Sequence, residues 1–336
     1  MPPRIHRMTI ALTCSLLMLA AAGCRTADGG DSGTGTAPGT PKTPPPARSG
    51  TAAALPQPPV GSSAGSLTID GTPRTYRIYR PASLPADHKI PLVVMLHGGF
   101  GSGHQAEQTY GWDAEADRHG FIVAYPDGLD HAWNVGGGCC GTPGRTGLDD
   151  VAFVVQLLEG IRAKLPIDER RIFATGISNG GMFSYRLACD TRLFAAIGPD
   201  SATMLGNCPD PTPLSVIHIH GTADTSIRYL GGRGEGVAHI DGPAVPEVVG
   251  RWRTTDSCPR PKVTTAGSVT TSTSLCPGGR AVELVTIEGA GHQWPGAPAR
   301  SGLQKALGLD PPSQALDATD TIWQFFAAHP APSTAS

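Results

Sequence analysis

The sequence predicts an α/β fold with a mostly parallel sheet covered by helices on both faces. Two observations predict it. Apolar segments of strand length alternate with helical patterns along the chain. The run Pro91–Leu96 is continuously apolar, as expected of a strand buried on both sides. Residues 63–336 have a length that a single domain of this class can occupy.

The expected strands follow one another at the spacing of such a fold. An early edge strand is expected at 76–80. The further strands are expected at 91–96, 121–125, 171–175, 195–198, 215–219 and 282–287. Asp149 or Asp150 can cap a helix whose apolar residues recur at three- and four-residue steps up to Leu165. The other helices are expected at 179–189, 247–254 and 314–328.

The link between two of these strands bears on access to a site. Only 16 positions separate Pro199 from Ser215, where many enzymes of this class insert a lid. We therefore expect little or no lid, although residues 225–245 offer a second place for one. An open site suits bulky or polymeric substrates.

The first residues predict export. Arg4 and Arg7 precede an apolar stretch at 8–22 that meets small residues, so residues 1–23 are typical of a signal peptide and too short for a spanning helix. Cys24 directly follows Gly23 and resembles the lipidated cysteine of a bacterial lipobox. The usual leucine three positions earlier is Ala21 here, so cleavage by an ordinary signal peptidase stays open. We expect an extracellular protein, attached to the membrane through lipid on Cys24 or secreted.

Residues 24–62 predict a disordered tether. Of the 38 residues after Cys24, 15 are Gly or Pro and none is aromatic. Such a segment cannot bury enough apolar surface to offset its ordering entropy. Its proline content makes it a semi-extended spacer between the membrane and the domain that begins at residue 63.

Net charge and cysteine content indicate which partners, disulfides and metal sites to expect. The chain has a formal net charge of −2 and no run of Lys or Arg, so nucleic acid is not an expected partner, and we expect a monomer. Six cysteines follow Cys24 and allow 15 pairings in an oxidising compartment. Short loops favour Cys189–Cys208 and Cys258–Cys276, which leaves Cys139 and Cys140 as a vicinal pair or as free thiols. No paired CxxC spacing supports zinc, and no metal is expected.

A nucleophile motif stands between an expected strand and an expected helix. Gly176-Ile177-Ser178-Asn179-Gly180 matches G-x-S-x-G, in which glycines allow the sharp turn that exposes the serine. Its strand-turn-helix context is that of the α/β-hydrolase fold. Ser178 is therefore the candidate nucleophile.

A second glycine-rich segment follows the apolar strand at 91–96. Loops of this His97-Gly98-Gly99 type donate one backbone N–H to an oxyanion hole, and the residue after the nucleophile donates the other. We therefore predict backbone donors at Gly99 and Asn179.

The acid and the base follow in the chain order of this fold, serine first, then acid, then histidine. Asp224 lies on the turn after the expected strand at 215–219, and His292 lies just beyond the strand at 282–287. Asp200 comes one strand too early and Asp127 precedes the serine. His292 would take the serine proton, and Asp224 would hold the tautomer of the ring.

Two further features allow two interpretations each. His218 and His220 alternate on one strand as a metal pair can, but without a third ligand we expect packing and hydrogen bonding beneath the site. Trp133 and Trp294 are predicted to bind substrate as pocket walls, with core packing as the open alternative.

These motifs together resemble one family. The HGG loop, the GISNGG elbow, HGTAD and GxGHxWPG, with Tyr125-Pro126-Asp127-Gly128 and Trp133-Asn134 between them, resemble the polyhydroxybutyrate-depolymerase-like esterases, which are related to feruloyl and acetylxylan esterases. The resemblance covers roughly residues 66–328. It implies a triad of Ser178, Asp224 and His292. The family often has Cys or another residue at the position of Gly99.

The function expected from these residues is hydrolysis of a carboxylic ester through an acyl-enzyme, without a cofactor. Hydroxybutyrate oligomers and feruloyl or acetyl esters of plant polysaccharide all fit as substrates. Two alternatives stay open. One is a cell-envelope acyltransferase of the same fold, and the other is a non-catalytic lipoprotein that binds carbohydrate.

Overall fold

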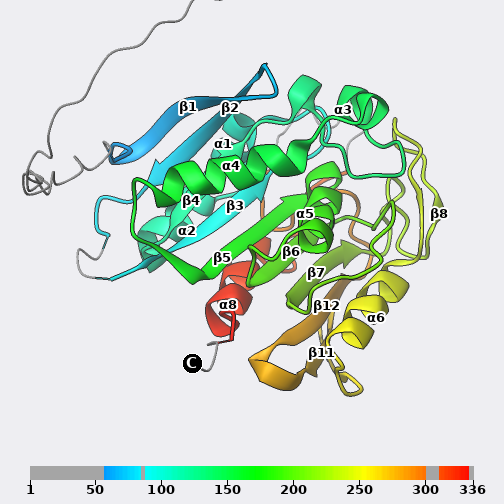
Figure 1. The fold of residues 1–336 in the computed structure, drawn as a ribbon. Helices are drawn as coiled ribbons and strands as arrows, with labels where there is room; N and C mark the ends of the chain where they lie inside the picture. Colours follow the sequence, from blue (N-terminus) through cyan, green and yellow to red (C-terminus); the bar gives the residue numbers. More distant parts are fainter. Residues whose placement is uncertain (1–56, 85–87, 300–309, 333–336) are drawn as a thin grey trace, which may run out of the picture. The chain divides into compact units, whose positions relative to one another are not determined.

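The computed structural model describes residues 57–84, 88–299 and 310–332. One large sheet dominates these residues, with the strand order β1-β2-β4-β3-β5-β6-β7-β12-β11-β10 (Figure 1). The predicted signal peptide, Cys24 and the tether up to residue 56 lie outside the described residues.

The strands of the large sheet are β1 (Gly61–Ile69), β2 (Thr72–Arg80), β3 (Ile90–Leu96), β4 (Ile122–Pro126), β5 (Ile167–Ile177), β6 (Ala196–Asp200), β7 (Ser215–Gly221), β10 (Lys262–Ala266), β11 (Val269–Leu275) and β12 (Ala281–Ile287). A separate small pair is formed by β8 (Gly232–Arg233) and β9 (Asp241–Gly242).

The centre of the sheet is parallel, as predicted. The strands β4, β3, β5, β6, β7 and β12 run in one direction. Antiparallel pairs extend the sheet at each side, β1 with β2 and β10 with β11. The carboxyl ends of the parallel strands therefore share one edge, where active sites of open α/β sheets form.

One predicted position was wrong. The strand expected at 76–80 is part of β2, but β2 is not the edge of the sheet, because β1 pairs with it from Gly61 to Ile69. The strand β1 also begins two residues before the predicted start of the domain at residue 63. Its exposed and half-buried residues alternate, and most of them are small or polar, so its apolar signal is weak.

The strand β3 shows how the chain builds two cores at once. Side chains alternate across a strand with a period of two. Leu92, Val94 and Leu96 accordingly join the apolar core on one face, and Val93 and Met95 join the core on the other. Because both faces are buried, the whole segment must be apolar, and this is why the sequence revealed it.

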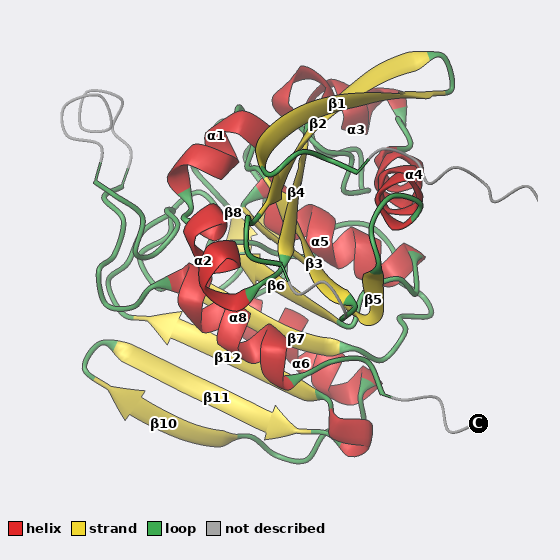
Figure 2. Ribbon diagram, turned by 90° about the vertical axis from the view of Figure 1, so that its left-hand side faces the viewer, coloured by secondary structure: helices red, strands yellow, loops and turns green. Residues whose placement is uncertain are grey.

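Helices cover both of these cores. On one face lie α4 (Asp150–Arg162), α5 (Asn179–Asp190) and α6 (Val245–Thr255). On the other face lie α1 (Gly103–Thr109), α2 (Trp112–His119) and α8 (Ala318–Ala328), of which α2 and α8 contact each other (Figure 2). Shorter helical turns are α3 (Gly141–Thr146), η1 (Leu129–His131) and η2 (Pro277–Gly279).

Side-chain caps set the starts of two predicted helices. Asp149 accepts a hydrogen bond from the Ala152 N–H at 2.8 Å and begins α4. Asp317 accepts from the Thr319 and Asp320 N–H groups, so α8 begins four residues later than the predicted position 314. None of the helices among the described residues has both the length and the apolar character needed to span a membrane.

Three disulfides are present among the described residues. Cys189–Cys208 and Cys258–Cys276 are the two predicted pairs, and Cys139 is joined to its neighbour Cys140. Disulfides persist in oxidising compartments, so the chain is consistent with an extracellular protein.

Candidate active site

Ser178 lies on the sharp turn between β5 and α5, with φ 56° and ψ −121°. The flanking glycines are there because the turn has no room for side chains. A Cβ on Gly176 would lie 2.6 Å from the Leu96 carbonyl oxygen, and one on Gly180 would lie 2.2 Å from the same atom. The pattern G-x-S-x-G is thus a packing requirement, and it holds the serine at the carboxyl edge of the sheet.

The glycine-rich loop after β3 runs directly beside this turn. A Cβ on Gly98 would lie 3.5 Å from the Ser178 Cβ. His97 fixes the loop from below, since its Nδ1 lies 2.8 Å from the Gly98 carbonyl oxygen and its Nε2 accepts from the Gly128 N–H at 2.9 Å. Burial lowers the pKa of His97 to about 4, so the ring is neutral, with Nδ1 as the donor.

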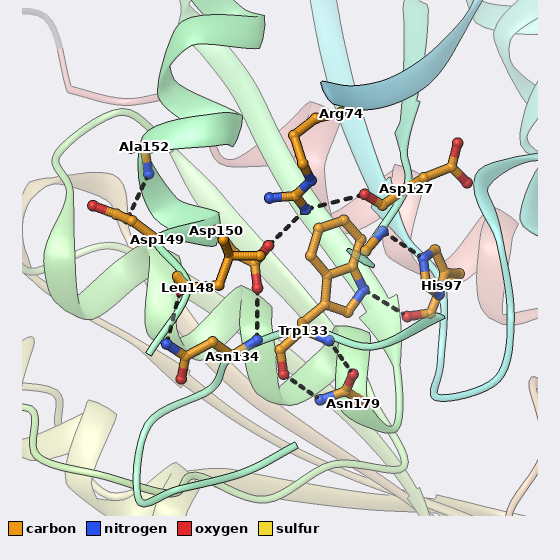
Figure 3. A network of polar contacts seen from close by, with 11 residues as sticks. Arg74, His97, Asp127, Trp133, Asn134, Leu148, Asp149, Asp150, Ala152 and Asn179 are labelled. Carbon is orange, nitrogen blue, oxygen red and sulfur yellow. Dashed lines mark hydrogen bonds and ion pairs between the residues drawn. The ribbon is translucent and has the colours of Figure 1, made fainter. Parts of the chain in front are cut away.

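Trp133 connects this loop to the residue after the nucleophile (Figure 3). Its indole Nε1 donates to the His97 carbonyl oxygen at 3.0 Å. The Asn179 side chain accepts from the Trp133 N–H at 2.7 Å and donates to the Trp133 carbonyl oxygen at 3.1 Å. The two predicted oxyanion segments are therefore joined through one buried tryptophan.

A buried ion pair supports the same segment from behind (Figure 3). Arg74 lies 2.6 Å from Asp150, and both side chains are buried. The second carboxylate oxygen of Asp150 accepts from the Asn134 N–H at 2.7 Å, and Arg74 donates to the Asp127 carbonyl oxygen at 3.1 Å. The backbone at residues 133 and 134 is thus held on both sides.

Asp224 follows β7 on a turn that packs against the loop after β12. A Cβ on Gly221 would lie 2.2 Å from the Ala290 carbonyl oxygen, which accepts from the Ala223 N–H at 2.9 Å. The close approach requires a glycine at position 221. It places the loop that carries His292 next to the turn that carries Asp224.

His292 and Asp224 form the central pair of the site. The ring Nδ1 lies 2.7 Å from Asp224 Oδ2. Burial alone raises the pKa of the Asp224 carboxyl, but hydrogen bonds from His220 and His292 outweigh burial and hold that pKa below its usual range. Asp224 is thus a carboxylate that orients the ring. Asp310, which the sequence did not reveal, accepts from the His292 N–H at 2.7 Å.

Ser178, His292, Gly99 and Asn179 line one cavity of about 780 Å³. The described residues hold no hydrogen bond between Ser178 and His292. In enzymes this bond is often long before substrate binds and shortens in the complex.

The rim of this pocket was not predicted. Phe100 and Val237 are 80% and 81% exposed although both are apolar. Backbone strain is also concentrated here. Among the described residues other than glycine, eight have positive φ, and the five that line the pocket are Phe100, Asp130, His131, Ser178 and His239. Such strain persists where surrounding structure enforces it, and it is frequent at functional sites.

The alternative acids have other roles. Asp127 accepts from the Gly103 N–H at 2.7 Å and from the Thr75 hydroxyl at 2.8 Å, so it joins α1 to β2. Asp200 ends β6 in full burial, which raises the pKa of its carboxyl well above the usual value. A carboxyl that stays protonated cannot stabilise an imidazolium.

His218 and His220 are hydrogen-bonded and buried beneath the site, as predicted. In the part of the chain that the structure describes, no cluster of three or more His, Cys, Asp or Glu residues could hold a metal ion.

The prediction that Trp133 and Trp294 form walls of the pocket was wrong. Trp133 is fully buried and stacks on Phe183 with ring centroids 4.9 Å apart. Trp294 is 2% exposed and donates through Nε1 to the Thr319 hydroxyl at 3.0 Å. Neither residue lines the cavity, so both belong to the packing alternative.

Known proteins are similar to this chain in sequence or in fold. Over 226 residues the chain is 31% identical to feruloyl esterase B of Piromyces equi, covering 63% of this chain but only 41% of that protein. It is 30% identical over 264 residues to feruloyl esterase C of Emericella nidulans, covering 76% and 84%. The acetyl xylan esterase from Aspergillus awamori shares the fold with a TM-score of 0.55 at 16% identity, covering 79% of this chain and 99% of that one.

The sequence profile described as "Esterase PHB depolymerase" matches residues 74–245, which is half of the chain. That segment contains the glycine-rich loop, the nucleophile turn and Asp224. The chain therefore belongs to the esterase PHB depolymerase family.

Proposed function

We propose that this esterase hydrolyses carboxylic esters through an acyl-enzyme formed on Ser178, with His292 as general base and Asp224 as the orienting acid. The observation that carries the proposal is the 2.7 Å contact between His292 Nδ1 and Asp224 Oδ2 at the wall of the cavity that Ser178 also lines. Because Nδ1 faces the carboxylate, Nε2 is the nitrogen left to meet the serine.

The proton path follows from this arrangement. His292 Nε2 takes the Ser178 proton as the hydroxyl attacks the ester carbonyl, and the resulting imidazolium is stabilised by Asp224. The imidazolium then returns the proton to the leaving alkoxide. Water attacks the acyl-enzyme by the same route and releases the acid. No cofactor takes part in these steps.

The negative charge on the carbonyl oxygen needs donors in place before the reaction. Gly99 and Asn179 both line the cavity. Asn179 is the first residue of α5, and the N–H of that position has no partner within the helix. We assign the oxyanion hole to these two backbone N–H groups, since such donors typically account for a factor of roughly a hundred to a thousand in turnover.

The pocket favours a bulky acyl group over a small one. It holds about 780 Å³ and is lined by the exposed apolar side chains of Phe100 and Val237. A planar aromatic acyl group would cover both side chains, whereas an acetyl group would leave them in water. The relatives named feruloyl esterase agree with this preference. The proposed substrates are therefore feruloyl-type esters, with hydroxybutyrate oligomers as the second group.

Replacement of the nucleophile tests the chemistry. The purified Ser178→Ala protein should lose p-nitrophenyl acetate hydrolysis and should not react with a fluorophosphonate probe, which should label Ser178 in the parent. Hydrolysis at the parental rate by Ser178→Ala would refute the mechanism. The preferred acyl group is tested separately, by comparing kcat/KM for feruloyl, acetyl and 3-hydroxybutyryl esters. An acetyl ester preferred on kcat/KM would refute the aromatic preference.

We also propose that the chain acts at the cell surface, as a monomer tethered by lipid on Cys24 and by the residues between Cys24 and β1. The Cys24→Ser protein should then lose incorporation of radiolabelled palmitate and move to the culture medium. Equal retention of both proteins in the membrane fraction would contradict the anchor.

A further inference from the structure

Asp224 faces a second imidazole besides that of His292. His220 Nε2 lies 3.4 Å from Asp224 Oδ2, the oxygen that also faces His292. His220 is fully buried on β7, whereas the His292 side chain is 19% exposed at the pocket. The proposed catalytic acid therefore lies between one accessible ring and one inaccessible ring.

His220 ends a chain of buried hydrogen bonds that begins on α5. The Tyr185 hydroxyl lies 2.7 Å from His218 Nδ1, and His218 Nε2 lies 3.0 Å from His220 Nδ1. His220 Nε2 then lies 2.9 Å from the Ile227 carbonyl oxygen. Tyr185, His218 and His220 are each 0% exposed.

With one N–H on each imidazole, these hydrogen bonds run in a single direction. The Ile227 carbonyl oxygen can only accept, so the hydrogen of the His220 ring must be on Nε2. A neutral imidazole has one N–H, and His220 Nδ1 must therefore accept from His218 Nε2. His218 Nδ1 in turn accepts from the Tyr185 hydroxyl.

The charge states agree with this assignment. Burial and the neighbouring His220 lower the pKa of His218 well below its usual value, so that ring is neutral. Burial raises the pKa of Tyr185 well above its usual value, so the hydroxyl keeps its proton. Every donor along the chain is therefore matched to an acceptor.

Burying three polar side chains costs desolvation free energy, which apolar residues of similar size would not require. This cost suggests that the three residues have a role beyond filling the core. We propose that His220 is a positioning residue for Asp224, and that Tyr185 and His218 hold it in the Nε2–H tautomer. This inference rests on the proposed function. The Ser226 and Ile227 N–H groups fix Asp224 Oδ1, each at 2.8 Å. The one Nε2–H of His220 lies between the Ile227 carbonyl oxygen at 2.9 Å and Asp224 Oδ2 at 3.4 Å.

Because His220 also faces Asp224 Oδ2, the Asp224 carboxylate should interact less strongly with His292 than it would without His220. Without the His220 donor, more of the Asp224 charge would act on the His292 imidazolium and would stabilise it. The other titratable groups around the pair are Asp200 at the end of β6, Asp310 behind His292, and Tyr229, whose ring centroid lies 5.9 Å from that of His220. All three are unchanged in His220→Leu, His220→Gln and Tyr185→Phe, and only the control below replaces Tyr229.

The test is the pH profile of kcat/KM for p-nitrophenyl acetate. His220→Leu should lower kcat about tenfold and move the acid limb to higher pH by roughly half a unit to one unit, the size of one lost hydrogen bond. His220→Gln, whose amide can donate to the same oxygens, should restore most of the profile. Tyr185→Phe should shift the limb in the same direction by less.

Tyr229→Phe is the matched control, since its hydroxyl contacts Thr286 Oγ1 at 2.9 Å and is not part of the chain. Its acid limb should coincide with that of the parent. A folded His220→Leu protein with the parental limb would overturn the inference. The proposed function is tested separately by Ser178→Ala in the same assay. If Ser178→Ala is inactive while His220→Leu keeps the parental limb, only the inference about His220 fails.

A second measurement covers the case in which His220→Leu does not fold. In the parent labelled with ¹⁵N-histidine, the ring shifts should show Nδ1 without hydrogen on both His218 and His220 at pH 7. A hydrogen on Nδ1 of His220 would reverse the chain and refute the assignment.

Discussion

His292 Nδ1 lies 2.7 Å from Asp224 Oδ2, although the two residues are 68 positions apart in the chain. The contact depends on the close packing of two loops, one after β7 and one after β12. It leaves Nε2 as the ring nitrogen that does not face Asp224, and it makes the charge of Asp224 the first test of the proposed triad.

Asp224→Asn should therefore reduce kcat by about ten-thousand-fold with little change in KM, because the amide cannot stabilise the imidazolium and favours the wrong tautomer. The measurement is steady-state hydrolysis of p-nitrophenyl acetate. Asp241→Asn, at an exposed carboxylate on β9, is the control and should retain the parental kcat. Parental turnover by Asp224→Asn would show that another acid acts in its place.

The side chain of Asn179 gives a separate prediction about the oxyanion hole. Asn179→Ala keeps the backbone N–H but leaves the buried Trp133 N–H without its acceptor, whereas the Trp133 carbonyl oxygen still accepts from the Cys140 N–H at 3.1 Å. We expect the free energy of unfolding to fall by about 2 kcal/mol, from the cost of an unpaired buried N–H. We expect kcat to fall about tenfold as the two loops separate.

Chemical denaturation and steady-state kinetics measure the two effects. Asn179→Asp retains the acceptor for the Trp133 N–H but not the donor to its carbonyl oxygen, so it should lie between Ala and the parent. Unchanged kcat in a destabilised Asn179→Ala protein would mean that the contact serves folding alone.

The sequence predicted the parts of the molecule that local chemistry determines. The strand β3 is apolar throughout because both of its faces are buried, and the turn at Ser178 needs glycines because Leu96 is so close. Both signals lie in a few consecutive residues. The proposed triad could be located in the sequence because each member follows a strand of the parallel sheet, at its carboxyl edge.

The rest depends on contacts that no local pattern carries. The strand β10 is exposed along its whole length and β11 consists mainly of Thr and Ser, so neither has an apolar run. A tryptophan fits a pocket wall and a core equally well, and only packing decided for Trp133. The pairing of Tyr185 on α5 with His218 on β7 joins residues 33 positions apart.

Gly180 and Gly160 lie in contrasting surroundings, one tightly packed against backbone and one open. A Cβ on Gly180 would lie 2.2 Å from the Leu96 carbonyl oxygen and 2.5 Å from that of His97, whereas a Cβ on Gly160 in α4 meets nothing within 4 Å. Gly180→Ala should lower the free energy of unfolding by about 3 kcal/mol, since backbone must move. Gly160→Ala should raise it by about 1 kcal/mol, as alanine favours a helix over glycine. Guanidinium denaturation measures both, and equal effects of the two substitutions would contradict the packing argument.

Asp113 gives a prediction about pH. Burial raises the pKa of its carboxyl to about 6, in spite of the hydrogen bond from the Tyr125 hydroxyl at 2.6 Å. The folded state therefore holds the proton more tightly than the unfolded state, whose pKa is close to the ordinary value of 3.8. It follows that this group lowers stability as pH rises through the window from about 4 to about 6.

Asp113→Asn removes the titration and keeps an oxygen that can accept from Tyr125. Its Tm should exceed that of the parent at pH 7 to 8, and the difference should shrink as the pH falls through 4 to about 3, where the parental carboxyl is protonated in both states. Differential scanning calorimetry at several pH values measures this. A difference in Tm that is constant with pH, or that grows toward pH 4, would show that the folded protein does not disfavour the Asp113 carboxylate.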